Sequence, residues 1–259
     1  MALAEWRMVE KHIALITLNR PEAANSLSLE ILDELNQSVR EINKDHHIYC
    51  TIITGAGSRA FCSGADLKER KDMSERQVMQ TVSYISETVG NIENLRMPVI
   101  AAINGAAYGG GLELALACDI RLAASGAKMG LTETSLAIIP GAGGTQRLPR
   151  IIGVGQAKRL IYTAEPISAH EAYTLGLVEI VTDSDKLLEE SISLAGSIAK
   201  NGPVAVSQAK TAINQGLQTD ITTGLGIEQL SYRGTLYTSD RLEGLKAFQE
   251  KRKPVYKGE

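Results

Sequence analysis

The sequence predicts an α/β protein with a parallel sheet, followed by a helical C-terminal region. Apolar strand-like segments alternate with helical ones as far as about residue 124, and the strand signal fades after about residue 130. The 259 residues are enough for one large domain, whose core needs neither disulfides nor a metal. With 44% hydrophobic and 22% charged residues, the composition excludes disorder.

The spacing of apolar residues defines the expected elements in order. Strands are expected at residues 12–19, 49–54, 98–103 and 120–124, with a last short candidate at 177–181. Helices are expected at residues 28–43, 67–71, 74–95 and 111–118, with Ser28 and Ser74 as N-caps. Four more helices follow at residues 185–200, 203–214, 220–237 and 240–252. We expect two domains, residues 1–190 and 191–259, the second packing on the body or on a neighbouring subunit.

Composition and motifs exclude several functions. A net charge of -3 and 4% aromatic residues argue against nucleic acid as a main partner. Three scattered cysteines, with no signal peptide and no long apolar run, predict a cytoplasmic protein without a membrane anchor. The four histidines form no metal-binding motif, so no metal is expected. The sequence has no GxxxxGK[ST] or GxSxG motif, and residues 141–146 (GAGGTQ) lack the last glycine of a dinucleotide fingerprint.

Two glycine-bearing segments are the first candidates for a site. Residues 55–66 (GAGSRAFCSGAD) and 104–116 (NGAAYGGGLELAL) each follow a strand and lead into a helix, and no glycine precedes Gly55. Both turns should reach the carboxyl edge of the sheet, where their free N–H groups could form an oxyanion hole. The alternative is that the triplet at 109–111 only allows a tight turn and close helix packing. The glycines at 141–144 have the pattern of a structural turn.

Two glutamates are the candidates for acid–base chemistry. Glu113 is the only charged residue between Pro98 and Cys118, and it lies in the first turn of an apolar helix. A buried carboxylate there is either tuned for catalysis or satisfied by core backbone donors. Glu133 precedes an apolar run and could by itself be a solvated helix start. Two N–H donors and two carboxylates together suit the addition of water to an α,β-unsaturated thioester, or the reverse elimination.

These residues lie in segments that resemble the crotonase (enoyl-CoA hydratase/isomerase) superfamily over nearly the whole chain. The matching segments are NRPEAANSLS (19–28), AFCSGADLKE (60–69), PVIAAINGAAYGGGLELALACDIRLAA (98–124), IIPGAGGTQRLPR (138–150) and DRLEGLKAFQEKRKP (240–254). The amino-acid sequence of residues 128–150 and 213–229 resembles that of the methylglutaconyl-CoA hydratase branch, also known as the AU-rich-RNA-binding homologue.

The resemblance implies a crotonase-like spiral of ββα units with a C-terminal helical trimerisation region, assembled as a trimer or a dimer of trimers. It implies an enoyl-CoA hydratase, a hydro-lyase of fatty acid or branched-chain amino acid breakdown, without a cofactor apart from the coenzyme A of the substrate. The implied catalytic groups are the N–H groups of Ala65 and Gly110, Glu133 as proton donor to carbon, and Glu113 as holder of the water. The implied coenzyme A contacts are Ala24, Ala65, Asp66, Leu67 and Lys68, with Phe248 and Lys251 from an adjacent subunit.

The acyl group is left open between a short straight enoyl-CoA and 3-methylglutaconyl-CoA. We expect the pocket walls in residues 71–89 and in the C-terminal helices, with Arg70, Lys71 and Arg76 as candidate cations for a second carboxylate. A Δ3,Δ2-enoyl-CoA isomerase and an RNA-binding protein are the alternatives. RNA binding is not carried over, because residues 28–45 hold Arg40 and Lys44 against five acidic residues.

Overall fold

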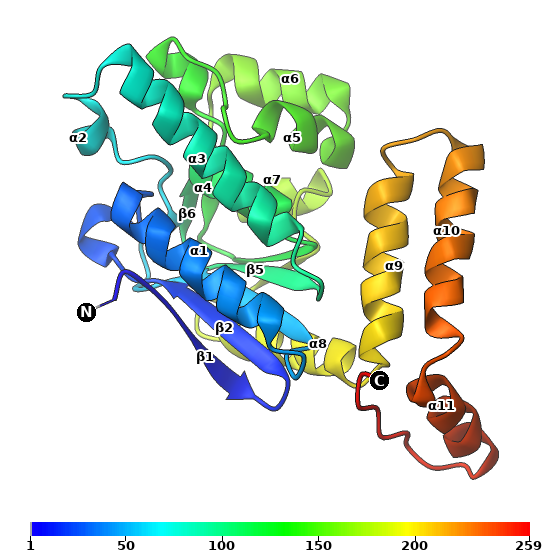
Figure 1. Ribbon diagram of the computed structural model, residues 1–259. Helices are drawn as coiled ribbons and strands as arrows, with labels where there is room; N and C mark the ends of the chain where they lie inside the picture. The colour runs from blue at the N-terminus through cyan, green and yellow to red at the C-terminus, as the bar shows by residue number, and fades with distance from the viewer. Residues whose placement is uncertain (1) are drawn as a thin grey trace.

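The computed structural model describes residues 2–259, and a six-stranded sheet organises its α/β body (Figure 1). The strand order is β1-β2-β3-β5-β7-β10. β1 and β2 form an antiparallel hairpin, and the other neighbouring strands are parallel. The strands are β1 (Ala4–Glu10), β2 (Ile13–Leu18), β3 (Cys50–Gly55), β5 (Val99–Ile103), β7 (Ile120–Ala124) and β10 (Ile180–Thr182). The central strands β3 and β5 are buried along nearly their whole length because both faces of the sheet are covered.

A second, four-stranded sheet has the order β4-β6-β8-β9. Its strands are β4 (Ala60–Cys62), β6 (Ala106–Tyr108), β8 (Lys128–Gly130) and β9 (Ile167–Ser168). β4, β6 and β8 run parallel and each follows a strand of the large sheet, namely β3, β5 and β7. The chain therefore repeats a unit of a long strand, a short strand and a helix, which confirms the predicted spiral of ββα units.

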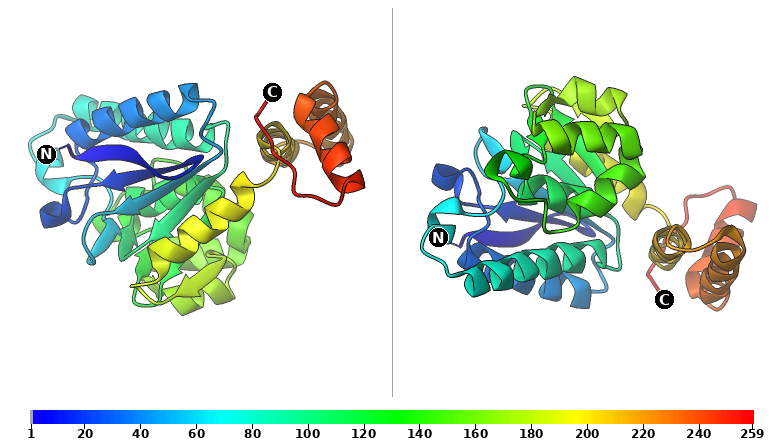
Figure 2. Two further views of the ribbon diagram at one scale, coloured as in Figure 1. Left: turned by 90° about the horizontal axis from the view of Figure 1, so that it is seen from below. Right: turned by 90° about the horizontal axis from the view of Figure 1, so that it is seen from above.

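Helices cover both faces of the large sheet (Figure 2). α1 and α3 lie on one face and α8 on the other, in contact with β3 and β5. Ser28 caps α1 by accepting the Ile31 N–H, and Ser74 forms a capping box on α3, as predicted. The helices of the body are η1 (Pro21–Ala23), α1 (Leu29–Lys44), α2 (Leu67–Arg70), α3 (Glu75–Glu93), α4 (Gly110–Ala117), η2 (Glu133–Leu136), α5 (Gly144–Ile152), α6 (Val154–Thr163), α7 (Ala169–Thr174) and α8 (Leu187–Ala199).

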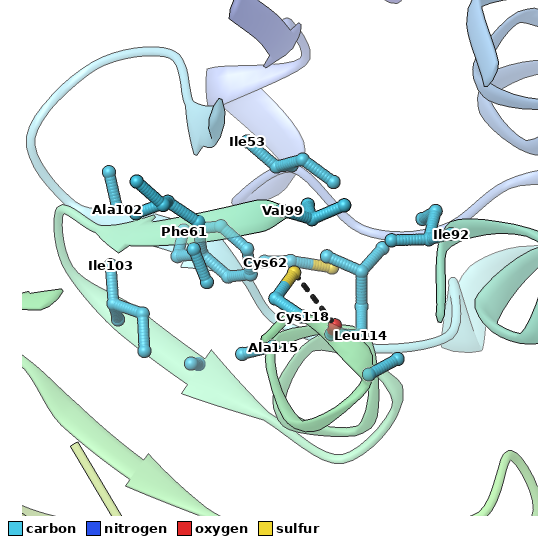
Figure 3. Packing of buried hydrophobic residues seen from close by; sticks show 14 of the residues in the cluster. Ile53, Phe61, Cys62, Ile92, Val99, Ala102, Ile103, Leu114, Ala115 and Cys118 are labelled. Carbon is cyan, nitrogen blue, oxygen red and sulfur yellow. Dashed lines mark hydrogen bonds between the residues drawn. The ribbon is translucent and has the colours of Figure 1, made fainter. Parts of the chain in front are cut away.

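The core surrounds α4, which is buried and, apart from Glu113, apolar. Figure 3 shows Leu114 and Ala115 of this helix packed with Phe61, Cys62 and Val99 from neighbouring strands. A Cβ built on Gly111 would lie 2.0 Å from the Cys62 carbonyl oxygen, so the first turn of α4 packs directly on the β4 backbone. This packing fixes the start of α4, and with it the single charged residue of the helix, Glu113.

The C-terminal helices stand apart from the body as an arm (Figures 1 and 2). They are α9 (Pro203–Gly216), α10 (Ile221–Thr235) and α11 (Ser239–Gln249), close to the predicted helices. Lys210 of α9 pairs with Asp119 at 2.9 Å and donates to the Met97 carbonyl, which ties the arm to the body. α8 spans residue 190 and packs on the sheet as one helix. The expected division into domains 1–190 and 191–259 stays a prediction. Within residues 2–259, none of the helices combines the length and apolar character needed to cross a bilayer.

Several short elements differ from the sequence prediction. The last strand lies at Ile180–Thr182 rather than at 177–181, and α5 to α7 were not predicted. The strands β4, β6, β8 and β9 are two or three residues long, too short to show a period of two. β6 lies inside the segment that the sequence assigns to a glycine turn. β1 was missed although it pairs with β2 through a turn at His12, which has a φ of 69°.

Candidate active site

One cavity of about 110 Å³ lies at the carboxyl ends of β4, β6 and β8. Carboxyl ends of parallel strands share one edge of a sheet, which is where ligands bind in α/β proteins. The cavity is lined after β4 by Ser63, Gly64, Ala65 and Leu67, after β6 by Gly109, Gly110 and Glu113, and after β8 by Thr132, Glu133 and Leu136. The four residues predicted as catalytic, which the sequence spreads over three segments, therefore meet on one cavity. Among the described residues, no group of three or more His, Cys, Asp or Glu is arranged to hold a metal ion.

Glu113 is clamped at one side of this cavity. Its side chain is buried in the first turn of α4, and Oε1 accepts the N–H groups of Ala142 and Gly144, each at 2.7 Å. Burial raises the pKa of Glu113 above its ordinary value, while the two N–H groups and the Arg147 guanidinium oppose the rise. Oε2 accepts no hydrogen bond from residues 2–259. Because Glu113 lines the cavity, this second oxygen is available to a ligand or a water.

Glu133 opens the short helix η2 on another wall of the cavity. Burial raises the pKa of Glu133 to about 7, and the negative charge of Glu113 adds to the rise, whereas its own backbone N–H and Arg70 oppose it. Oε2 of Glu133 is buried without a hydrogen-bond partner among residues 2–259. A carboxyl group in this setting can exchange a proton near neutral pH.

The N–H groups of Ala65 and Gly110 are neighbours with no bound acceptor in the described residues. Leu27 pairs with Ala65 in a parallel bridge, but the bridge uses the Gly64 carbonyl and the Asp66 N–H. Successive N–H groups of extended backbone point to opposite sides, so the Ala65 N–H faces away from Leu27. Gly110 begins α4, where an N–H has no acceptor within its own helix. A Cβ built on Gly110 would lie 3.7 Å from the Ala65 nitrogen, so the two residues are neighbours on the cavity wall.

Two glycines here require bare backbone. Gly64 has a φ of +92°, and a Cβ on it would lie 2.8 Å from the Tyr108 carbonyl oxygen. Gly109 has a φ of +50°, and a Cβ on it would lie 3.1 Å from Oε1 of Glu133. The glycine triplet therefore does more than allow a turn, because a side chain at Gly109 would meet a cavity carboxylate.

The residues predicted to contact coenzyme A are divided by the structure. Ala65 and Leu67 line the cavity, while Ala24 and Lys68 lie in the neighbouring backbone outside it. Asp66 is engaged inside the protein: it caps α2 and pairs with Arg20. The remaining two are Phe248, near the end of α11, and Lys251, just after that helix; neither lines the cavity.

The cavity walls differ in part from the sequence prediction. Val82 and Ile85 of α3 do line it, within the expected 71–89 stretch. In this chain, however, a further part of the wall comes from residues 136–142 and not from the C-terminal helices, because those helices stand apart as an arm. Of the three candidate cations, Arg70 lines the cavity, and Lys71 and Arg76 are not among its lining residues.

Sequence reasoning also missed the clamp on Glu113. Residues 141–144 were interpreted as a structural turn, yet the N–H groups of Ala142 and Gly144 hold the carboxylate. A signal was present in principle, since a buried carboxylate requires donors and a glycine-rich turn offers them.

The α/β fold thus places two carboxyl groups, and two N–H groups that have no acceptor among residues 2–259, on one cavity. The sequence model of the enoyl-CoA hydratase/isomerase family matches residues 8–259, so the chain belongs to that family, as the sequence resemblance predicted. The relatives bear the names of enoyl-CoA hydratases, which confirms the predicted enzyme class.

Two curated relatives and one solved structure show how close the match is. Human mitochondrial methylglutaconyl-CoA hydratase is 50% identical over 251 residues, covering 95% of this chain and 74% of that protein. The short-chain-enoyl-CoA hydratase of Clostridium acetobutylicum is 43% identical over 94% of both chains. The crystal structure of an enoyl-CoA hydratase from Bacillus anthracis has a TM-score of 0.98 at 56% identity, covering 99% of this chain and 100% of that one.

Proposed function

We propose that the protein adds water reversibly across the α,β double bond of a 2-enoyl-CoA thioester. The thioester carbonyl oxygen accepts hydrogen bonds from the N–H groups of Ala65 and Gly110. When the oxygen of water bonds to the β-carbon, the π electrons of the double bond move onto this carbonyl oxygen as an enolate. Donors that are already in place stabilise that charge without reorganisation. The observation that carries the proposal is the meeting of these two N–H groups with two unlike carboxylates on one cavity.

The two carboxylates share one proton in this mechanism. Glu113, ionised, holds the water through its free oxygen and takes one of its protons. Glu133, protonated, gives its proton to the α-carbon as the enolate returns to a thioester. Dehydration also starts with one proton on the pair, but on Glu113 instead of Glu133. The number of protons is the same because the net reaction neither releases nor takes up a proton.

A rate assay on crotonyl-CoA tests this function. The wild-type protein should hydrate it, and the variant carrying both Glu113→Gln and Glu133→Gln should lose most of that activity while keeping its fold by circular dichroism. Full activity in the double variant would end the proposed mechanism. Isomerisation of a 3-enoyl-CoA that is faster than hydration of the 2-enoyl-CoA would favour the isomerase reaction.

For the acyl group we propose a short chain that carries a second carboxylate, such as 3-methylglutaconyl-CoA. The walls are mostly apolar, with Val82, Ile85 and Ile138, which suits a short branched chain. Arg70 adds a cation to this lining, and its Nε is buried without a hydrogen-bond partner in residues 2–259. A guanidinium in that state favours a carboxylate ligand.

Replacing Arg70 tests the acyl preference separately from the reaction. Arg70→Met should lower kcat/KM for 3-methylglutaconyl-CoA by roughly tenfold to a hundredfold, the loss expected for a charged hydrogen-bonding partner, and should lower that for crotonyl-CoA much less. Lys71→Met is the matched control, because the neighbouring lysine is not part of the cavity lining. Equal losses on both substrates would contradict a role for Arg70 in recognising the acyl group.

We also propose that the protein assembles as a homo-oligomer and that coenzyme A is bound between subunits. Phe248 is 85% exposed, and the arm that carries it exposes many further apolar side chains, among them Ile213, Leu217, Leu230 and Leu242. An apolar surface of that extent needs a partner. Light scattering should give a trimer or a hexamer, and Phe248→Ala should raise KM for the thioester more than it lowers kcat.

A further inference from the structure

Behind the clamp on Glu113 lies an ion pair that the mechanism above does not use. Arg147 of α5 donates from Nε and from one terminal nitrogen to the two carboxylate oxygens of Glu93, at 3.0 and 2.6 Å. Its other terminal nitrogen donates to the Ala142 carbonyl at 2.9 Å. A guanidinium with all three nitrogens engaged is held in one orientation.

This guanidinium braces the backbone that holds Glu113. It bonds the carbonyl of Ala142, whose own N–H is one of the two donors to Glu113 Oε1. It also packs on Gly143, where a Cβ would lie 2.0 Å from the nearest guanidinium nitrogen. Gly143 has a φ of +99°, so the segment between the two donors adopts a conformation that few residues allow.

Glu93 connects the Arg147 guanidinium to α3, and this helix also forms part of the cavity wall. Glu93 is the last residue of that helix, and Val82 and Ile85 of the same helix line the cavity. A second contact joins the same two parts, since a Cβ on Gly141 would lie 2.7 Å from Val82 Cγ1. The segment at residues 141–144 is therefore joined to α3 twice, directly at Gly141 and through Arg147, which bonds both the Ala142 carbonyl and Glu93.

We propose that Arg147, oriented by Glu93, is a positioning residue that fixes the distance between the clamp and Glu113 and so couples the α3 wall to this carboxylate. The proposal rests on the hydratase function proposed above, because it assigns Glu113 a role in that reaction. It adds residues that touch neither the substrate nor the reacting atoms.

The charges that face Glu113 make the effect measurable. Arg147 of α5 is the cation acting on it, and Glu133 of η2 is the anion across the cavity. Arg147 favours the ionised form of Glu113 and keeps its pKa lower than burial alone would. Removing the guanidinium should therefore raise the pKa of Glu113. If ionised Glu113 is needed, the acid limb of the rate profile should move to higher pH while the alkaline limb stays.

Steady-state kinetics of Arg147 variants on crotonyl-CoA test the proposal. Arg147→Met should lower kcat by roughly tenfold to a hundredfold, as expected when a reacting group is misplaced by a fraction of an ångström, with little change in KM and an acid limb at higher pH. Arg147→Lys keeps the positive charge, but its single ammonium nitrogen cannot reproduce the bonds that the three guanidinium nitrogens make to Glu93 and Ala142. It should return the acid limb toward the wild-type position and leave kcat low.

Two further variants separate positioning from general stability. Glu93→Gln should lower kcat less, and adding it to Arg147→Met should cause no further loss, since the two residues act as one unit. Arg150→Met is the matched control, because Arg150 lies on the same helix and bonds only Gln146 of that helix. A kcat equal to that of the wild type in both Arg147→Lys and Glu93→Gln would overturn the proposal, even if Arg147→Met does not fold.

An independent readout keeps this proposal separable from the hydratase function. Carbon NMR of labelled glutamate, with the Glu113 signal assigned by its absence in Glu113→Gln, follows the titration of this carboxyl without any reaction. The signal should titrate at higher pH in Arg147→Met. A wild type that hydrates no 2-enoyl-CoA would defeat the proposed function, whereas an unmoved Glu113 titration in Arg147→Met would defeat only the inference on Arg147.

Discussion

The two sides of the cavity hold the same functional group in opposite ways. Glu113 lies in a buried helix, with one oxygen fixed by two backbone N–H groups and a cation nearby. Glu133 begins a short 3-10 helix whose apolar neighbours Leu136 and Ile139 are exposed, and its Oε2 has no partner in the described residues. Burial raises the pKa of both groups; two N–H groups from another segment and Arg147 oppose the rise at Glu113, whereas its own backbone N–H and Arg70 oppose it at Glu133.

The difference explains how two glutamates can divide one reaction. The two N–H groups and the nearby cation favour the ionised form of Glu113 against burial and fix its geometry, which suits the holding of a water molecule. An unclamped carboxyl with a pKa of about 7 can carry a proton and release it. In the proposed mechanism the environments separate the roles, since the side chains themselves are identical.

Single replacements of the two glutamates should have the largest effects, and they test whether Glu113 and Glu133 play different roles. Each of Glu113→Gln and Glu133→Gln should lower kcat by roughly 10²–10⁴-fold, the usual contribution of a positioned acid or base. They should differ in pH dependence, which steady-state rates will show. Glu133→Gln should remove the fall in rate near pH 7, whereas Glu113→Gln should leave it. The same residual pH profile in both variants would mean that the two sides are not distinct.

A change in the clamp should have a smaller effect on one side alone. A Cβ at Gly144 would lie 3.0 Å from Glu113 Oε1 and 2.8 Å from Leu131 Cδ1, so Gly144→Ala should shift the carboxylate. We expect kcat to fall by roughly tenfold to a hundredfold, the size of effect that a small misplacement produces. Gly155→Ala in α6 is the control, because a Cβ there meets nothing within 4 Å. Equal kcat in the two variants would show that the clamp is not needed.

The smallest effect is expected from the scaffold that both sides share. Ser28 caps α1 and lies outside the cavity lining. Ser28→Ala should reduce the free energy of unfolding by about 1 kcal/mol, the usual value for a lost N-cap, measured by urea denaturation. The kcat ratio between wild type and the two glutamine variants should be the same in this background. A changed kcat ratio would mean that α1 affects catalysis at the site.

The candidate site was predictable to the extent that a residue stood out from its surroundings. Glu113 did so as a lone charge in an apolar helix, and Glu133 did so once it had a partner. The glycine segments after strands indicated where N–H donors would lie, and the family resemblance implied Ala65 and Gly110 in particular. Arg147 and Glu93 gave no such signal, because they lie 54 residues apart and each is an ordinary surface charge until the fold joins them.

The fold shows the same limit. Long buried strands such as β3 and β5 and the capped helices α1 and α3 were predicted from their apolar spacing. The second sheet was not, because β4, β6 and β8 are held by tertiary packing rather than by a pattern of their own. These short strands are the ones whose carboxyl ends carry the cavity, so the site rests on elements that local sequence does not reveal.

The pH dependence of kcat/KM in both directions tests the shared proton of Glu113 and Glu133 most directly. Hydration and dehydration, followed from about pH 5 to about pH 9, should give the same bell-shaped profile, because both need one proton on the pair. The alkaline limb should fall near pH 7, where Glu133 loses its proton, and it should vanish in Glu133→Gln. A rate that keeps rising above about pH 8, or an alkaline limb that survives in Glu133→Gln, would contradict the proposed division of roles.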